Sequence, residues 1–546
     1  MFLFSIIIRL CIVFLLLSVI IVPIVLQQVY NIGIGNSAGY YFSFYSIVLF
    51  AYVFIQFVFS IINNKRQTYL NLNDELDNEH DSKKINICVI GYRENPIYFK
   101  QCLESALVCA EKTPNFNKLY IIIDGQDPED IYMKELFLSV FKNDAIHINL
   151  DTLPSKTKSD DESLDFIDEI SEIQFKKFVC ITQPHAGKRH GLYTAFKFSI
   201  LENKILNKNI KSIFCNDSDT VMGEESANEL YKCLRSEKVG ASTGVLRMLN
   251  LYDSPVSFLV GVRYWFAFYI ERAYQSFNKA VLCVSGPIGM YKLSEIEPII
   301  DEWVNQTFMG KECTYGDDRH LTVKILENGK QIVFTPKSIS KTETPDTLFR
   351  FYKQQIRWAK SSYREFFWNL KCIHKHSLWM TVDLTYQSIY SFVVLGVMFY
   401  ILLSGSFYTM GLYFLSIFGV GFVKGIYASI YERNPEYLFF ASYGIIFLFV
   451  IIPARLFAMI NMYDISWGTS SRLHISDKLG SDFIFLIFWY ITFGSIIGYS
   501  LYNSTMNYLS DPTLYPNNNY WFFVSSIIIF VSSFVLLKLY LRFKIK

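Results

Sequence analysis

Uncharged runs long enough to cross a membrane constrain this chain more than any other feature of its sequence. The hydrocarbon core of a bilayer is about 30 Å thick, so a helix needs roughly 20 apolar residues to span it. Two such runs open the chain, at residues 10–26 and 40–62. A signal peptide is the alternative for the first run, but that run is long, lacks a clear small-residue cleavage site and is followed at once by the second. Both runs are therefore predicted to be transmembrane helices.

Further apolar runs follow a long globular region. Four of them predict spans at residues 384–403, 408–431, 483–502 and 521–541. The predicted outer loops contain no Lys or Arg, whereas residues 64–66 and 542–546 are basic, so the positive-inside rule places the globular region and both termini in the cytosol. This placement requires an even number of crossings. The remaining run, residues 437–463, is interrupted by Pro453 and Arg455 and is predicted to lie at the cytosolic interface.

The chain is thus predicted to have three parts. Residues 1–63 form two transmembrane helices, residues 64–375 a cytosolic domain, and residues 376–546 a second transmembrane region. Only 18% of the residues are charged, where a soluble domain carries about 25%, and 51% are hydrophobic. The net charge of +2 argues against a nucleic-acid-binding role, and no paired CxxC spacing occurs among the ten cysteines, which are predicted to be reduced thiols.

Short β-branched runs in the globular region predict parallel strands of an α/β sheet. These runs are residues 85–90, 119–123, 178–181 and 212–215. Ligands bind at the carboxyl ends of the strands in such sheets. Polar residues follow each run: Gly91-Tyr92-Arg93-Glu94, Asp124-Gly125, residues 183–189 and Asp217-Ser218-Asp219. We therefore expect a polar site at this edge of the sheet.

Asp217 and Asp219 are candidates for binding a divalent cation. They follow a hydrophobic strand with one residue between them, so both carboxylates can approach one ion that is bound to a diphosphate. Mg²⁺ or Mn²⁺ suits such an oxygen-rich site. An Asp-x-Asp pattern is also typical of a solvated turn, because Asp bonds readily to its own backbone.

Two later motifs carry further candidate chemistry. In the segment 316–319, Asp317 and Asp318 supply adjacent carboxylates, and one of them could take a proton from a sugar hydroxyl as general base. The same pair also suits the first turn of a helix, and both interpretations can hold together. In the segment 354–358, Arg357 suits a phosphate contact and Trp358 can stack on a sugar ring. An amphipathic helix at the membrane interface is the alternative for that segment.

This ordered series of motifs between membrane helices resembles the processive family 2 glycosyltransferases, which include cellulose, chitin and hyaluronan synthases. The closer resemblance is to membrane-integrated hyaluronan synthases. The sequences that decide are Gly316-Asp317-Asp318-Arg319-His320-Leu321-Thr322, Thr342-Glu343-Thr344-Pro345, residues 354–364 and Trp467-Gly468-Thr469. The Glu-Asp-Arg and Gln-Arg-Arg-Arg-Trp motifs usual in chitin synthases do not occur.

The resemblance implies a fold and an arrangement in the membrane. The expected fold is an α/β glycosyltransferase A-type, Rossmann-like domain facing the cytosol and inserted between about six transmembrane helices. Amphipathic interface helices are expected at residues 254–277, 348–370 and 437–463. A gating loop is expected at residues 464–475, and a narrow channel for the product among the transmembrane helices.

The resemblance also implies roles for individual residues. Asp318 is expected to be the general base and Asp317 to support it. Asp219 is expected to bind the metal ion, with Asp217 beside it on the nucleotide. The residues expected to bind UDP are Tyr92, Glu94, Asp124, Lys188, Asp217, Arg357, Trp467, Thr469 and Arg472. The residues expected to bind the acceptor sugar are Trp358, Cys283 and Gln354.

The implied activity is inverting, processive synthesis of hyaluronan from UDP-N-acetylglucosamine and UDP-glucuronic acid, with Mg²⁺ or Mn²⁺, coupled to translocation of the growing chain. The expected surroundings are a lipid bilayer, with the plasma membrane as the location and no nucleic-acid partner. Two alternatives remain at this point. One is a chitin synthase that uses UDP-N-acetylglucosamine only, and the other is a membrane channel or transporter whose soluble domain senses nucleotide sugars. A glycosylation sequon at Asn503 is expected to lie in an outer loop.

Overall fold

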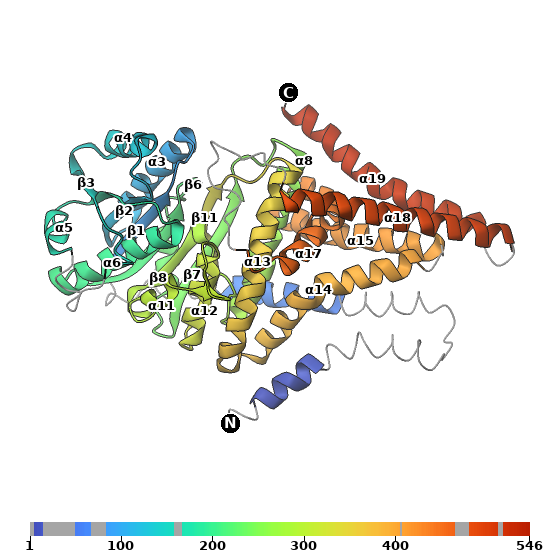
Figure 1. The fold of residues 1–546 in the computed structure, drawn as a ribbon, viewed down its shortest axis with the longest axis horizontal. Helices are drawn as coiled ribbons and strands as arrows, with labels where there is room; N and C mark the ends of the chain where they lie inside the picture. The colour runs from blue at the N-terminus through green and yellow to red at the C-terminus, as the bar shows by residue number, and fades with distance from the viewer. Residues whose placement is uncertain are drawn as a thin grey trace.

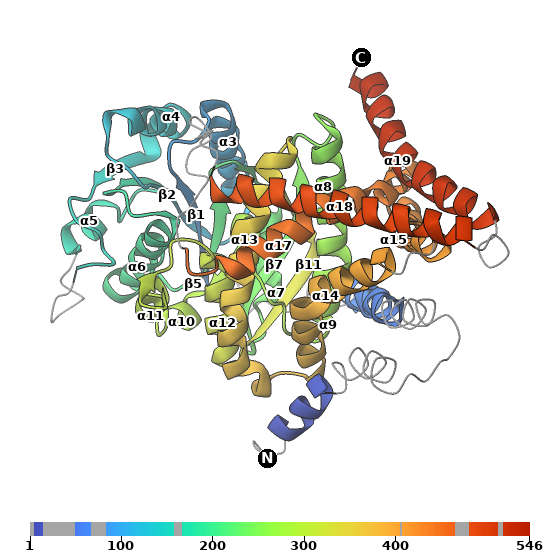
Figure 2. The same cartoon turned by 45° about the vertical axis from the view of Figure 1, so that its right-hand side comes forward.

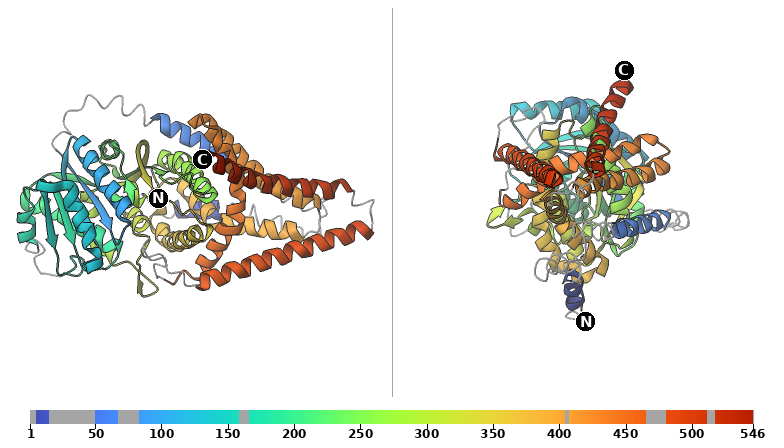
Figure 3. Two further views of the ribbon diagram at one scale, coloured as in Figure 1. Left: turned by 90° about the horizontal axis from the view of Figure 1, so that it is seen from above. Right: turned by 90° about the vertical axis from the view of Figure 1, so that its right-hand side faces the viewer.

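The computed structural model describes residues 5–14, 50–66, 83–157, 166–403, 407–464, 480–510 and 517–545. An α/β domain occupies one end of the molecule and a group of long helices the other (Figure 1). The long helices project away from the sheet (Figure 3).

A nine-stranded sheet forms the centre of the α/β domain. The strand order is β3-β4-β2-β1-β5-β8-β7-β11-β6. The bounds are β1 Lys84–Gly91, β2 Phe116–Ile123, β3 Ala145–Asn149, β4 Phe178–Thr182, β5 Ile210–Asp217, β6 Thr220–Val221, β7 Val239–Met248, β8 Gly289–Lys292 and β11 Gln331–Thr342. A separate hairpin joins β9 Thr307–Phe308 to β10 Lys311–Glu312.

The four predicted strands are confirmed as β1, β2, β4 and β5. They pair in parallel, β1 with both β2 and β5, and β2 with β4. β8 breaks the parallel pattern, since it runs antiparallel to β5 and β7. The central strands are buried along most of their length, as expected for strands with helices on both faces. The sequence predictions missed the other five strands of this sheet, β3, β6, β7, β8 and β11.

Helices pack on the sheet, and some of them position residues at its polar edge. Their bounds are α3 Pro96–Lys112, α4 Ile131–Phe141, α5 Ile167–Glu172, α6 Lys188–Leu206, α7 Ser226–Cys233, α10 Leu293–Ile296, α11 Ile300–Val304 and α12 Asp317–Glu327. Asn95 begins α3, because its side chain accepts a hydrogen bond from Ile97 N. α6 is buried on nearly all sides along its first four turns, which fixes the position of Lys188 at its start.

Two helical segments join the α/β domain to the long helices. α8 Pro255–Phe266 continues through a π-helical stretch, Ala267–Arg272, into α9 Ala273–Phe277, and α13 spans Leu348–Cys372. α13 runs along the boundary between the sheet and the long helices (Figure 2). The helices predicted at residues 254–277 and 348–370 are therefore present. Their location at a membrane interface stays a prediction.

Five helical segments among the described residues are long and apolar enough to cross a membrane. Four agree with predicted spans: α14 Leu378–Leu403, α15 Phe407–Glu432, α18 Ser481–Ser510 and α19 Asn517–Ile545. Of the two predicted N-terminal spans, the structure describes only helices at residues 5–14 and 50–66. The predicted outer loop that carries Asn503 is wrong in part, because α18 continues through Ser510 and includes the sequon.

The fifth segment, Pro435–Ile460, contains most of the predicted interface helix. It is irregular: a 3₁₀ turn at Pro435–Ser442 leads through α16 Tyr443–Ile446 and a π-helical turn at Phe447–Ile451 into α17 Ile452–Ile460. Its most apolar window is 56% buried, against 22–33% in the other four segments. A Cβ at Gly421 of α15 would lie 2.9 Å from Ala441 Cα, so glycine permits α15 to approach this segment closely. The position of the segment relative to a bilayer stays a prediction.

Candidate active site

Most of the predicted site residues line one cavity of about 1150 Å³. Its wall runs from the carboxyl ends of β1, β2 and β5, past α12 and α13, to α14, α15 and the 435–460 segment. The predicted site residues that the structure describes all line it: Tyr92, Glu94, Asp124, Lys188, Asp217, Asp219, Cys283, Asp317, Asp318, Gln354, Arg357 and Trp358. Trp467, Thr469 and Arg472 lie outside the described residues, so the gating loop stays a prediction.

Asp124, at the end of β2, holds the loop that precedes α6. Its Oδ1 accepts a hydrogen bond from Ala186 N at 3.1 Å, and its Oδ2 accepts one from Gly187 N at 2.7 Å. Gly187 has a φ of +99°, a conformation that glycine adopts at little cost. Asp124 therefore fixes the start of α6 and with it the position of Lys188.

A pair of stacked rings lies beside Asp124. The rings of Tyr92 and His185 have centroids 4.0 Å apart and planes inclined by 18°. His185 Nδ1 lies 2.8 Å from Asp124 Oδ2. This hydrogen bond raises the pKa of His185 above its usual value, although burial opposes the shift. The two rings provide flat faces of the kind that stack on a nucleobase.

Glu94 connects the end of β1 to the Asp217-Ser218-Asp219 motif at the end of β5. Its Oε2 accepts a hydrogen bond from Ser218 Oγ at 3.1 Å, and its Oε1 accepts one from Asn95 N at 3.1 Å. The carboxylate of Glu94 thus braces two neighbouring strand ends against each other. The predicted contact of Glu94 with uridine stays a prediction.

Lys188 lies beside both acidic motifs. Its Nζ lies 2.5 Å from Asp217 Oδ1 and 3.8 Å from Asp317 Oδ2. Burial alone would lower the pKa of Lys188, but the two carboxylates outweigh burial and raise it, so the amine stays charged. Burial raises the pKa of Asp217, although Lys188 opposes that shift. A positive charge is therefore fixed at the point where both acidic motifs meet.

Asp217 and Asp219 fit a metal ion only together with further oxygen ligands. Asp219 Oδ1 accepts hydrogen bonds from Thr220 Oγ1 at 2.9 Å and Thr342 Oγ1 at 3.3 Å, which orient its carboxylate. Across the described residues, no group of three or more His, Cys, Asp or Glu side chains is arranged to hold a metal ion. Mg²⁺ commonly takes one or two carboxylates together with substrate phosphates. The pair therefore fits an ion that arrives with a diphosphate.

Asp318 lies in the first turn of α12, as the helix-terminus interpretation predicts, and its role as general base stays a prediction. Its Oδ1 accepts a hydrogen bond from Arg319 N at 2.8 Å. The thiol of Cys283 lies 3.6 Å from its Oδ2. Burial raises the pKa of Cys283, and the charge of Asp318 adds to the effect, so the thiol stays protonated and donates. The structure thus brings the predicted base, Asp318, into contact with Cys283, a residue predicted to bind the acceptor sugar.

α13 carries three predicted residues to the cavity. The ring of Trp358 lies 6.0 Å from that of Tyr264. Burial lowers the pKa of Arg357, although Asp317 and Asp318 oppose the shift. Gln354 Oε1 is buried and has no hydrogen-bond partner among the described residues. A buried amide oxygen of this kind in a cavity wall can accept a hydrogen bond from a ligand hydroxyl.

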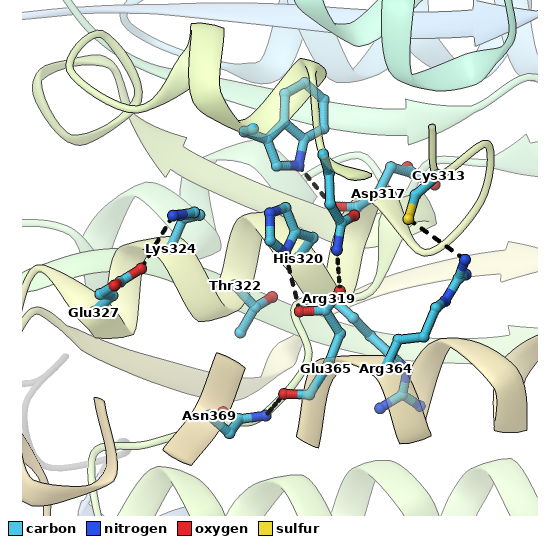
Figure 4. Close-up of polar contacts among 12 residues, drawn as sticks. Cys313, Asp317, Arg319, His320, Thr322, Lys324, Glu327, Arg364, Glu365 and Asn369 are labelled. Atoms are coloured by element: carbon cyan, nitrogen blue, oxygen red, sulfur yellow. Dashed lines mark hydrogen bonds and ion pairs between the residues drawn. The ribbon is translucent and has the colours of Figure 1, made fainter. Parts of the chain in front are cut away.

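A polar network that the sequence analysis missed fixes α12 against α13. Trp303 Nε1 donates to Asp317 O at 3.0 Å. Glu365 Oε1 accepts from Gln306 Nε2 at 2.8 Å, and its Oε2 lies 3.0 Å from His320 Nδ1 (Figure 4). Burial lowers the pKa of His320, although Glu365 opposes the shift. Glu365 directly follows the 354–364 motif and could have been found there, whereas Trp303 and Gln306 belong to no sequence pattern.

Comparisons with known proteins identify the family of this chain. A family described as "Glycosyltransferase like family 2" matches residues 129–361. Hyaluronan synthase 2 from Gallus gallus is 34% identical over 449 residues, which cover 80% of this chain and 78% of that protein. Hyaluronan synthase 3 from Mus musculus is 32% identical over 438 residues, which cover 79% and 77%.

A solved structure of a mannosyltransferase from Pyrobaculum calidifontis, in complex with GDP-Man and Mn²⁺, is similar over 76% of this chain and 97% of its own at 13% identity, with a TM-score of 0.39. That likeness is weak, and the assignment depends on the sequence relatives. Their identity extends over most of both chains. The chain is a glycosyltransferase that belongs to the hyaluronan synthase family.

Proposed function

We propose that this protein polymerises hyaluronan from UDP-N-acetylglucosamine and UDP-glucuronic acid in alternation and passes the product through its own membrane helices. The observation that carries the proposal is the continuity of the cavity. One wall holds Lys188 and Asp217, and the same cavity reaches Val394 in α14 and Tyr413 in α15. A product made at the first end therefore has a path toward the helices.

The charge of the inner cavity favours an acidic polymer over a neutral one. The inner cavity is the part lined by α8, the π-helical stretch that follows it, α15 and α17. Four cationic side chains and one carboxylate line this part: Arg263, Arg272, Lys424, Arg455 and Glu271. Glu271 Oε2 accepts from Arg263 Nη2 at 2.9 Å. Arg272 Nη1 is buried without a hydrogen-bond partner among the described residues. Buried charges need partners. The carboxylates of a glucuronate-containing chain would supply them, whereas chitin carries no such charge.

The proposed reaction is an inverting displacement. The hydroxyl group of the acceptor sugar attacks the anomeric carbon of the donor, a glycosidic bond forms, and UDP leaves with the bonding electron pair. Asp318 takes the proton of the attacking hydroxyl. Lys188 and Arg357 stabilise the charge that develops on the departing diphosphate, and such fixed electrostatic stabilisation is commonly the largest contribution to catalysis.

Acceptor and donor must be oriented for this step. Cys283, which contacts Asp318, and Trp358 line the cavity and would hold the acceptor sugar. Gln354 would accept a hydrogen bond from one of the sugar hydroxyls. Asp217 and Asp219 would hold Mg²⁺ or Mn²⁺, which when bound neutralises diphosphate charge. Trp467, Thr469 and Arg472 would close over UDP.

The proposal includes the location of the protein. A catalytic domain in the cytosol meets its UDP-sugars there, and a plasma-membrane location allows the polymer to leave the cell. The candidate spans support a multi-pass membrane protein. The proposal also includes the position of residues 437–463 at the cytosolic interface of the membrane. It includes the division of the chain into residues 1–63, 64–375 and 376–546.

The test is incorporation of radiolabelled sugar into high-molecular-weight polymer by the purified full-length protein. One reaction contains UDP-N-acetylglucosamine alone and the other contains both UDP-sugars, each with Mg²⁺ or Mn²⁺. We expect polymer only with both donors, and digestion of that polymer by hyaluronidase. Polymer from UDP-N-acetylglucosamine alone would identify a chitin synthase, and no polymer with either mixture would favour a nucleotide-sugar sensor.

A further inference from the structure

A chain of buried hydrogen bonds connects the membrane-side helices to the loop that carries Cys283. Gln275 in α9 stands in its middle. Gln275 Nε2 donates to Asp383 Oδ2 in α14 at 2.9 Å, and Gln275 Oε1 accepts from Leu282 N at 3.2 Å. Leu282 directly precedes Cys283. One amide side chain therefore ties a candidate membrane span to the wall of the candidate acceptor site.

Asp383 is held from two further directions. Its Oδ1 accepts from Tyr52 OH, in the helix at residues 50–66, at 2.5 Å, and its Oδ2 also accepts from Gln387 Nε2 at 2.9 Å. The ring of Tyr52 stacks on that of Tyr386 with centroids 3.8 Å apart. Asp383 is 2% exposed and Gln275 is 8% exposed. Two helices from distant parts of the sequence thus meet α9 at one carboxyl group.

The acceptor-side loop is anchored at its other end by the helix of the candidate base. Val284 N donates to Thr322 Oγ1 at 2.9 Å, and Thr322 Oγ1 donates to the backbone oxygen of Asp318 at 2.7 Å. Between these two anchors, Cys283 donates from its thiol to Asp318. The position of Cys283 relative to Asp318 therefore depends on Gln275 at one end of the loop and on Thr322 at the other.

The chemistry of Asp383 determines the orientation of Gln275. The oxygens of Asp383 accept hydrogen bonds from Tyr52, Gln275 and Gln387. Gln275 must therefore turn its NH₂ group toward Asp383 and its oxygen toward Leu282 N. In the opposite orientation the amide oxygen of Gln275 would face the oxygen of Asp383, and its NH₂ group would face Leu282 N. Neither contact is a hydrogen bond, and unsatisfied buried polar groups cost free energy. The membrane-side carboxyl group thus determines which atom reaches the acceptor-side loop.

We infer that Gln275 is a positioning residue that couples the packing of α14 and the 50–66 helix to the seat of the acceptor sugar beside Asp318. This inference rests on the proposed function, since it takes the Cys283 side of the cavity as the acceptor site. Gln275 acts through the Leu282–Cys283 loop, and the donor-binding residues Lys188 and Asp217 lie on other elements. Loss of Gln275 therefore changes acceptor binding and retention without changing donor binding.

The experiment compares Gln275→Leu with wild type, using full-length protein in nanodiscs. It measures the affinity for UDP-N-acetylglucosamine by calorimetry, the KM for an added hyaluronan tetrasaccharide as acceptor, and the product length with both UDP-sugars. We expect donor affinity within twofold of wild type, an acceptor KM raised roughly 10- to 100-fold, and shorter polymer, because small displacements of a positioned group cost about this much. An unchanged acceptor KM, or an equal loss of donor affinity, would overturn the inference.

Three further variants separate positioning from simple destabilisation. Gln275→Glu keeps an acceptor for Leu282 N but places a carboxylate against Asp383, so we expect the same acceptor defect. Asp383→Asn can turn its amide oxygen toward Gln275 and its NH₂ toward Tyr52, so we expect this variant to keep an acceptor KM near that of wild type. Ser276→Ala, on the same helix, removes a buried hydrogen bond to Phe334 N and lowers stability without touching the loop. A similar acceptor defect in Ser276→Ala would contradict the inference.

These readouts also separate the inference from the proposed function. If wild type makes polymer from UDP-N-acetylglucosamine alone, the proposed function fails, and the same comparison is then made with a chitin tetrasaccharide as acceptor. If wild type makes hyaluronan and Gln275→Leu keeps its acceptor KM, the inference alone fails. Should Gln275→Leu not fold, the comparison of Gln275→Glu with Asp383→Asn decides the question.

Discussion

Cys283 Sγ lies 3.6 Å from Oδ2 of Asp318, and the thiol is the donor in this contact. The two residues are 35 positions apart in sequence and come from a loop and a helix terminus. Because the thiol donates, the carboxylate of Asp318 is the acceptor in this contact. The contact orients that carboxylate toward Cys283 in the cavity wall. This contact supports the assignment of Asp318 as general base and of Cys283 as a residue that positions both the base and the acceptor.

We predict that Asp318→Asn lowers polymer synthesis by roughly 10²- to 10⁴-fold, the contribution typical of general acid–base catalysis. The substituted amide oxygen can still accept from Arg319 N, so the fold and UDP binding are expected to be retained. Polymer assays and calorimetric titration with UDP check these two expectations. Synthesis at the wild-type rate would rule out Asp318 as the base.

Cys283 offers a matched pair of controls for that experiment. Cys283→Ser keeps a hydrogen-bond donor beside Asp318 and is expected to retain more activity than Cys283→Ala, which removes the donor. Equal activity in the two variants would show that the thiol does not orient Asp318.

We predict that Mn²⁺ binds tightly only when UDP is present. Two carboxylates, Asp217 and Asp219, are too few to hold the ion, and the diphosphate supplies the remaining oxygens. Electron paramagnetic resonance of Mn²⁺ measures the free ion directly. Asp219→Asn is expected to weaken UDP-dependent binding by roughly tenfold or more, since loss of a supporting group alone commonly costs about that much. Equally tight binding without UDP would contradict this prediction.

We predict a pH dependence of stability that depends on His185. The hydrogen bond to Asp124 raises the pKa of His185 in the folded state, against the effect of burial. A raised folded-state pKa stabilises the fold fully below the unfolded value of about 6.5, and this stabilisation is lost as the pH rises through the folded value. The difference in unfolding midpoint between wild type and His185→Gln should therefore be largest in mild acid and disappear in mild base.

His147 provides the control of opposite sign. Burial lowers the pKa of His147 in the folded state. Its contribution is present above the unfolded pKa and is lost as the pH falls, because the unfolded chain then binds the proton more readily. His147→Gln should thus make the protein relatively more stable in mild acid. The same sign for both variants would contradict the assignment.

The sequence predicted the parts of the fold that follow from local patterns. β1, β2, β4 and β5 are short β-branched runs, and four of the predicted spans have matching helices, because apolar periodicity and length determine such elements locally. β8 could not be predicted in this way, since only its neighbours β5 and β7 make it a strand. The Asn503 loop was wrong because a polar sequence can continue a helix beyond an apolar span.

The residues of the candidate site also fall into two groups, those that the sequence predicted and those that it did not. Motifs with a fixed spacing identified Asp217, Asp318 and Arg357, which the structure brings to one cavity. Residues whose role depends on a partner far away in sequence were missed. Glu365 directly follows the 354–364 motif, but its contacts with His320 and Gln306 could not be read from the sequence. The contacts of Gln275 with Asp383 and Leu282 N likewise have no pattern along the chain.

We predict that Lys424→Gln and Arg272→Gln shorten the polymer without changing the affinity for UDP. Both cations line the cavity and would attract the carboxylates of the growing chain. Gel electrophoresis of the product measures length, and calorimetry measures UDP affinity. Polymer of wild-type length from both variants would argue against a charged path.

We predict that Gly316→Ala impairs both stability and catalysis. Gly316 begins α12 with a φ of +82°, and a Cβ there would lie 2.2 Å from Ser361 Oγ of α13. A residue with a Cβ in this conformation costs about 1–3 kcal/mol, and the steric contact would push α12, with Asp317 and Asp318, away from α13. We expect a lower unfolding midpoint and a larger loss of polymer synthesis than of UDP binding. Ser361→Gly in the same chain removes the steric contact but leaves the backbone strain, so it should restore only part of the activity. Full activity of Gly316→Ala alone would show that α12 tolerates a shift against α13.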